Sequence, residues 1–89
     1  MSRSITIQPI RMDAMPYEAN LSYNGSSYHL LFGRHSFGWF LCIPNHRIGV
    51  ELAEPSDFFW NRANLQHTGV PAGEAKAIAD ALKELSLYI

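Results

Sequence analysis

Apolar and polar residues alternate with a period of two over most of the first half of the chain, which is typical of strands with one buried face. Ser4–Gln8 shows this pattern, and Tyr17–Tyr23 shows it again. Asn24-Gly25 follows at once and favours a two-residue type I′ turn, because both turn residues need a positive φ. That turn predicts three cross-strand pairs: Tyr17 with Phe32, Ala19 with Leu30, and Leu21 with Tyr28. All three pairs are apolar on both sides, whereas a slip by one residue would set polar residues against apolar ones.

The alternation continues through two more strands. A four-residue loop at Arg34–Phe37 predicts that Phe32 faces Trp39, that Tyr28 faces Ile43, and that His29 lies directly opposite Cys42. The Pro44–Arg47 turn then predicts Ile43 beside Ile48 and Trp39 beside Leu52. One face of the resulting sheet is apolar in every strand: Tyr17, Ala19, Leu21, Tyr28, Leu30, Phe32, Trp39, Leu41, Ile43, Ile48, Val50 and Leu52, with Ile5 and Ile7 extending it.

Such a face must be covered, and two helical patterns follow the strands. The first can be capped by Ser56 or Asp57, and its apolar residues are Phe58, Phe59, Trp60 and Leu65. The second follows Gly69-Val70-Pro71 and carries an amphipathic stripe at Ala75, Ile78, Ala79, Leu82 and Leu85. We therefore expect a single α+β domain over residues 1–89. It is an antiparallel meander of four to five strands within about residues 4–52, with two C-terminal helices, at about 56–66 and 71–87, packed on one face.

Composition narrows the class of protein. The chain has 89 residues, of which 47% are hydrophobic and 17% charged, and this fits one globular domain. A formal net charge of −1 argues against nucleic acid as a partner. The single cysteine cannot form an internal disulfide, which indicates a reducing compartment. There is no apolar run for a signal peptide or a membrane span, so we expect a cytoplasmic protein.

The second face of the predicted sheet is mixed and contains the candidate site: His29, Leu31, Phe40, Cys42 and Glu51. A histidine beside a cysteine can activate the thiol, which would suit a cysteine- and histidine-dependent enzyme or a ligand-binding module. A free cysteine is more often a small buried hydrophobe, so we assign no catalytic residue. If left uncovered, the apolar members would form a patch for a partner protein or a second copy. A covering helix or strand is the alternative.

The Arg34–Phe37 loop is expected at the edge of this surface, so Arg34, His35 and Phe37 complete the predicted partner-binding residues. The four histidines are far apart in sequence and show no metal-ligand spacing. There is also no phosphate loop or dinucleotide glycine pattern. We therefore expect neither a metal nor a cofactor.

Four segments together resemble a small uncharacterised protein family of gut bacteria, their phages and conjugative elements: Gly25–His29, Phe40–Asn45, Ile48–Leu52 and Asp57–Asn61. The resemblance covers roughly residues 17–85. No activity or catalytic residue of that family can be carried onto this chain. Its usual contexts imply a cargo protein of mobile elements, and many such proteins inhibit host defence, including anti-CRISPR proteins. We expect a small non-enzymatic protein that binds a host protein, with the cysteine- and histidine-dependent enzyme or a homodimeric interaction protein as alternatives.

Overall fold

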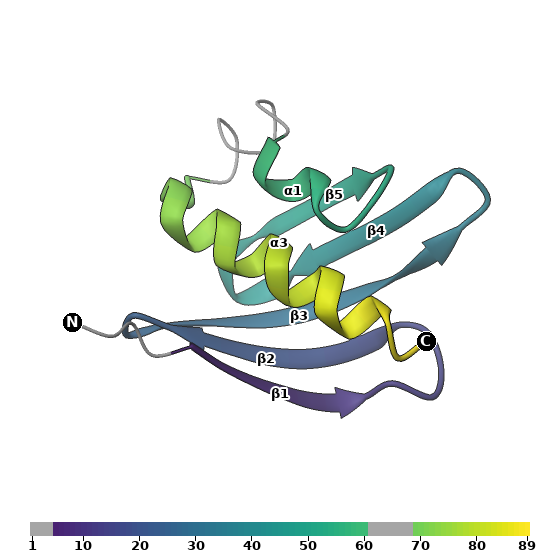
Figure 1. The fold of residues 1–89 in the computed structure, drawn as a ribbon, viewed down its shortest axis with the longest axis horizontal. Coiled ribbons are helices and arrows are strands. Elements are labelled where there is room, and N and C mark those ends of the chain that lie inside the picture. Colours follow the sequence, from purple (N-terminus) through teal and green to yellow (C-terminus); the bar gives the residue numbers. More distant parts are fainter. Residues whose placement is uncertain (1–4, 61–68) are drawn as a thin grey trace.

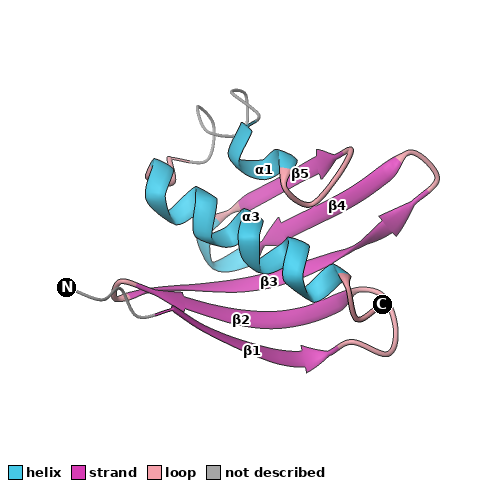
Figure 2. Ribbon diagram, in the orientation of Figure 1, coloured by secondary structure: helices cyan, strands magenta, loops and turns pink. Residues whose placement is uncertain are grey.

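The structure is a computed structural model that describes residues 5–60 and 69–89, the side chains of Phe59 and Trp60 excepted. Its elements are β1 (Ile5–Arg11), β2 (Tyr17–Tyr23), β3 (Ser26–His35), β4 (Gly38–Ile43), the 3-10 turn η1 (Pro44–His46), β5 (Ile48–Leu52), α1 (Asp57–Trp60) and α3 (Ala72–Ser86). The five strands form one antiparallel sheet in chain order. Both helical segments lie on the same face of this sheet (Figures 1 and 2). The predicted α+β meander is confirmed.

Two of the three predicted strand registers are confirmed. The β2–β3 hairpin pairs Tyr17 with Phe32, and it turns at Asn24 and Gly25 with φ of 52° and 85°. Such positive values are what a type I′ turn requires. The β4–β5 pairing sets Trp39 opposite Leu52, and η1 makes the connection between these strands.

The predicted β3–β4 register is wrong by two residues. β3 continues to His35 and β4 begins at Gly38, so the turn is two residues long instead of four. Phe32 consequently faces Leu41, and Cys42 faces Leu31. A shift of two residues leaves every side chain on its predicted face. The predicted pairing of His29 with Cys42, however, is not formed.

The predicted apolar face is the buried face of the sheet. Its fully buried members include Ala19, Leu21, Leu30, Leu41 and Ile43. They pack with six buried residues of α3: Ala75, Ile78, Ala79, Ala81, Leu82 and Leu85. The stripe predicted for the second helix is therefore the one that covers the sheet.

The prediction of two covering helices is not borne out. Over the described residues the sheet has one full helix, α3, of 15 residues, because α1 is a single turn of four. α1 still contributes Phe58, which is completely buried in the same core. The remainder of the predicted first helix, including Leu65, lies outside the described residues. No described helix is long and apolar enough to cross a membrane.

A polar contact fixes the start of α3 on the sheet. Glu74, in the first turn of the helix, accepts hydrogen bonds from the hydroxyl groups of Ser26, at 3.0 Å, and Tyr28, at 2.5 Å. His46 stacks on the Tyr28 ring, with 4.3 Å between the ring centroids. Burial first, and then the hydrogen bond to Glu74 and its negative charge, raise the pKa of Tyr28 to about 12. This cluster ties the helix, the first hairpin and η1 together at one end of the sheet.

Candidate functional site

The sheet face turned away from α1 and α3 is not covered by either helical segment (Figure 1). We call it the outer face, and it comprises Glu18, His29, Leu31, Gly33, Phe40, Cys42, Gly49 and Glu51. Four of the predicted site residues are half-buried there: His29, Leu31, Phe40 and Cys42. Glu51 is exposed. The sequence left open whether this face is covered, and over the described residues it lies open.

The Phe40 ring occupies space that is available because residue 33 is a glycine. Gly33 lies directly opposite Phe40, and a Cβ atom on Gly33 would come within 2.7 Å of the Phe40 ring and 3.0 Å of the Met15 sulfur. The ring therefore lies over Gly33, with Met15 beside it. The Arg34 N–H donates a hydrogen bond to the Met15 sulfur at 3.3 Å, although the Met15 side chain remains 54% exposed. Sequence reasoning missed Met15, since it precedes a strand and belongs to no periodic pattern.

His29 is oriented toward β2 and away from Cys42. Its Nε2 atom lies 2.6 Å from Oε2 of Glu18, which is diagonal to it on the neighbouring strand. The His29 backbone N–H donates to Oδ1 of Asn45 at 3.0 Å. Glu18 lies on this face opposite Leu31, but it is not among the candidates named from the sequence. Its diagonal position relative to His29 was the signal that could have identified it.

Cys42 has no polar neighbour in its strand pairing. It lies between Leu31 on β3 and Gly49 on β5. A Cβ atom on Gly49 would meet nothing within 4 Å, so a gap adjoins the thiol. Glu51 is paired with Phe40 instead. The described residues contain no group of three histidine, cysteine or carboxylate side chains able to hold a metal ion.

Replacing His29 with alanine is expected to leave the reactivity of Cys42 unchanged, because the histidine is engaged by Glu18 and does not pair with the cysteine. The measurement is the rate of Cys42 alkylation by iodoacetamide in the native protein. Leu31→Ala, which uncovers the thiol on its β3 side, serves as the comparison and should increase the rate. A marked decrease in the alkylation rate of the His29→Ala protein would indicate that His29 activates the Cys42 thiol.

The predicted loop residues are separated in the structure. Arg34 extends from β3 on the helix side of the sheet, where its guanidinium group stacks on the Trp39 ring at 5.1 Å. Nδ1 of His35 accepts a hydrogen bond from the Phe37 N–H at 3.2 Å across the tight turn. Phe37 is 92% exposed at the tip of the hairpin. The outer face and this tip are thus two distinct places, and Arg34 belongs to neither.

Comparison with known proteins identifies the family but no activity. No curated protein and no solved structure matches the chain. A family model matches residues 1–89, a longer stretch than the resemblance noted above. The expectation of an uncharacterised family is therefore confirmed, while its association with phages and mobile elements stays a prediction. The chain belongs to the Family of unknown function (DUF6618).

Proposed function

We propose that this chain is a small non-enzymatic protein that binds a partner protein through its outer face. The observation that supports this most strongly is the presence of Leu31, Phe40 and Cys42, with the exposed Met15, on a sheet face that no described element covers. Apolar side chains grouped on an uncovered surface are typical of protein interaction sites.

The composition of the outer face also fits a protein partner. Its centre is apolar and contains an aromatic anchor, Phe40, whereas Glu18, His29 and Glu51 place polar groups around that centre. Binding interfaces show the same arrangement of an apolar core, rich in aromatic residues, and a polar rim. Phe37, at the nearby hairpin tip, offers a second exposed aromatic ring.

The resemblance to proteins of mobile elements supports a host protein as the partner. In that setting the chain would act as an inhibitor of host defence, comparable with anti-CRISPR proteins. This part of the proposal rests on the resemblance, and the binding role rests on the outer face. The direct pairing of His29 with Cys42, on which the enzyme alternative was based, is not formed. A homodimer through the outer face is the other alternative.

Phe40→Lys is expected to weaken partner binding by about thirtyfold or more, the usual effect of removing a central aromatic anchor. Lysine is preferred to aspartate because Phe40 lies opposite Glu51, where a second negative charge would destabilise the sheet. The matched control is Ser22→Lys. Ser22 is an exposed residue of β2 whose side chain lies on the same side of the sheet as Phe40. Affinity capture by the three proteins from cells of the encoding organism, read by quantitative mass spectrometry, should show proteins retained by wild type and Ser22→Lys but lost by Phe40→Lys.

The fold of each variant is checked by circular dichroism and thermal unfolding. If a folded Phe40→Lys protein retains the same captured proteins, the outer face is not the binding surface. Light scattering tests the homodimer. A dimer that Phe40→Lys converts to a monomer would assign the outer face to a second copy of the chain.

A further inference from the structure

β1 is an edge strand, and its free edge pairs with no other described strand. The two residues that flank the β2–β3 turn form a hydrogen-bonded pair, and such pairs alternate along an antiparallel ladder. Even-numbered residues of β2 therefore bond to β1, where they meet Thr6 and Gln8. Ile5 and Ile7 must then direct their backbone N–H and C=O groups outward. Pro9, the next residue in this series, has no N–H group, which suits an edge position.

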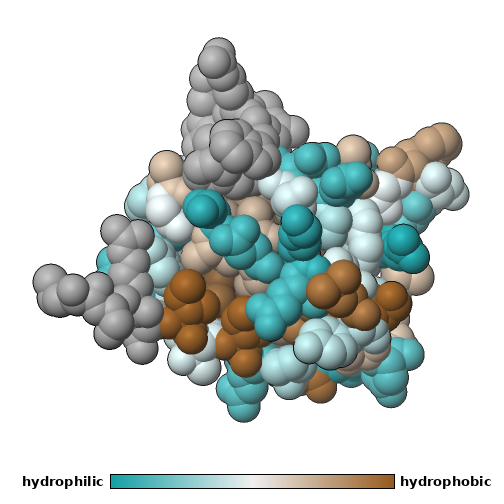
Figure 3. All heavy atoms as spheres, viewed as in Figure 1, coloured by the Kyte–Doolittle hydropathy of each residue, from teal (hydrophilic) through white to brown (hydrophobic). Residues whose placement is uncertain are grey.

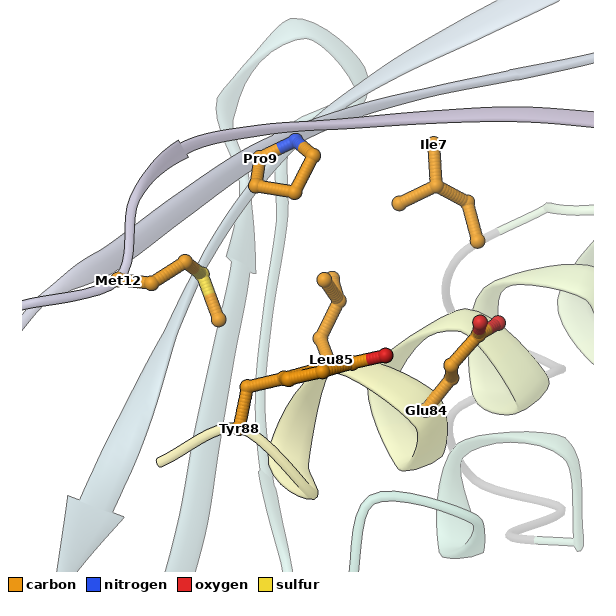
Figure 4. Close-up of a pocket in the computed structure, with 6 residues that line it drawn as sticks. All are labelled: Ile7, Pro9, Met12, Glu84, Leu85 and Tyr88. Atoms are coloured by element: carbon orange, nitrogen blue, oxygen red, sulfur yellow. The ribbon is translucent and has the colours of Figure 1, made fainter.

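A groove between β1 and α3 runs beside this free edge. It contains cavities of about 280 Å³ and 240 Å³. The larger one is lined by Ile7, Pro9, Met12, Glu84, Leu85 and Tyr88. Figure 4 shows Ile7 and Pro9 of β1 pointing toward Leu85 of α3, with Met12 and Tyr88 at one end. Apolar side chains gather along this part of the surface, over β1, with hydrophilic side chains of α3 next to them (Figure 3).

The groove is suited to side chains of a polypeptide. Each cavity is smaller than the roughly 300–1,000 Å³ typical of small-molecule pockets. Large apolar groups beside it remain open to solvent, since Ile5 is 52% and Tyr88 75% exposed. Its α3 rim carries two carboxylates, Asp80 and Glu84, against one ammonium group, Lys76. The excess of negative charge favours a partner segment that carries a basic side chain.

We propose that β1 and this groove bind an extended segment of a partner protein, which adds to the sheet as a further strand. The segment has apolar side chains at alternate positions and a lysine or arginine that meets the acidic rim of α3. Free backbone groups of Ile5 and Ile7 provide hydrogen bonds, and the two cavities select the side chains. This surface is separate from the outer face.

The pairing of the partner segment with β1 determines which of its side chains lie above the groove. In antiparallel pairing, residues opposite Ile5, Ile7 and Pro9 place their side chains on the helix side of the sheet, above the groove. Alternate residues of a strand are about 7 Å apart, so successive apolar side chains can reach successive cavities. The same residues direct their N–H groups at β1. The residues of the segment that place apolar side chains above the groove are therefore also the ones that form hydrogen bonds with β1.

A second copy of the chain fits this edge less well when the two β1 strands pair about Ile7. Symmetric pairing of two β1 strands about Ile7 would set Ile5 of one copy opposite Pro9 of the other. Because proline has no N–H group, the C=O of Ile5 would lose its donor at both ends of the ladder. A partner segment without proline at that position keeps these hydrogen bonds.

A display library of random twelve-residue peptides, selected against the purified full chain, tests the proposal. Enriched peptides should share apolar residues at alternate positions and at least one basic residue. Fluorescence anisotropy then measures the affinity of the best synthetic peptide. N-methylation at one of its apolar positions should abolish binding, whereas N-methylation at the residue between them should have little effect, because that N–H points away from β1.

Variants of the chain locate the site. Tyr88→Ala and Ile5→Lys should each lower the affinity for the peptide about tenfold or more. Leu87→Ala should not change this affinity, because Leu87 is 79% exposed and does not line the cavity. Phe40→Lys should also leave peptide affinity unchanged, which separates this site from the outer face.

Three results would overturn the proposal. One is a failure to enrich peptides with the alternating pattern, and another is equal affinity in the Tyr88→Ala and Leu87→Ala proteins. The third is a dimer by light scattering that Ile5→Lys dissociates, since the edge would then be occupied by a second copy.

Discussion

Replacing Gly38 with alanine is expected to destabilise the protein by about 3 kcal/mol or more. Gly38 begins β4 with a φ of 151°, a conformation that side chains rarely adopt. A Cβ atom placed there would lie 2.4 Å from the carbonyl oxygen of Leu52, and a backbone atom in a paired strand cannot move aside without breaking its own contacts. Since domains of this size are stable by about 5–15 kcal/mol, the loss is a large share of the total.

Urea denaturation at neutral pH measures the effect, and Gly49→Ala is its matched control. Gly49 lies on the next strand, and a Cβ atom there would meet nothing within 4 Å. Alanine at this position should be neutral or slightly stabilising, because it reduces the conformational freedom of the unfolded chain. Equal unfolding midpoints for the two variants would show that the Gly38 turn can shift to accept a side chain.

The backbone conformation at Gly38 matters for the candidate site because it sets the register of β3 against β4. The close approach of Gly38 to Leu52 fixes the start of β4, and this start places Phe40 over Gly33. A partly folded Gly38→Ala protein would therefore lose the shape of the outer face as well as stability.

The sequence predicts the faces of the sheet well and its exact pairings less well. Asn24-Gly25 defines one turn without ambiguity, and the alternation of apolar residues assigns each side chain to a face. Between β3 and β4 the sequence offers two glycines, Gly33 and Gly38, and both resemble turn residues. In the structure Gly38 follows the turn directly and begins β4, while Gly33 lies within β3 under the Phe40 ring. Local sequence does not distinguish these roles, since each depends on a contact with another strand.

The same limit applies to the site residues. Alternation places His29 and Cys42 on the outer face, as observed, but the neighbour of each residue depends on the register. The contact between Tyr28 and Glu74 spans 46 positions of sequence and joins a strand to a helix. The amphipathic pattern of α3 shows which side of the helix is buried. It does not show where along the sheet the helix lies, so it does not predict which hydroxyl group Glu74 contacts.

The Tyr28–Glu74 contact should make stability depend on pH in the alkaline range. The folded state raises the pKa of Tyr28 from 10.0 to about 12, through burial and then through Glu74. Below pH 10 the phenol is protonated in both states, and the contribution of the contact to stability is fully present. Between pH 10 and about 12 the unfolded state releases its proton first, so stability falls as pH rises. Because each tenfold change in proton affinity is worth about 1.4 kcal/mol, the total loss of stability is about 2–3 kcal/mol.

Urea midpoints of wild type and Tyr28→Phe at pH 9, 10, 11 and 12 measure this effect. The two proteins differ only in the Tyr28 hydroxyl group, so the contributions of all other groups cancel in the difference. At pH 9 the variant should be less stable by about 1–3 kcal/mol, the value of a hydrogen bond to a charged group. Its disadvantage should shrink through pH 11 and vanish or reverse by pH 12. Tyr88→Phe, which removes an exposed hydroxyl group, is the control and should follow wild type throughout.

Glu74→Gln separates the two causes of the raised pKa. Glutamine keeps an oxygen that can accept the Tyr28 hydrogen bond but removes the negative charge, whereas burial of the phenol is unchanged. We therefore expect this variant to lose less stability than wild type between pH 10 and 12 while retaining part of the decline, since burial is the larger cause. A decline equal to that of wild type would show that the carboxylate has no part in the effect. A constant difference between wild type and Tyr28→Phe across the whole range would contradict the linkage itself.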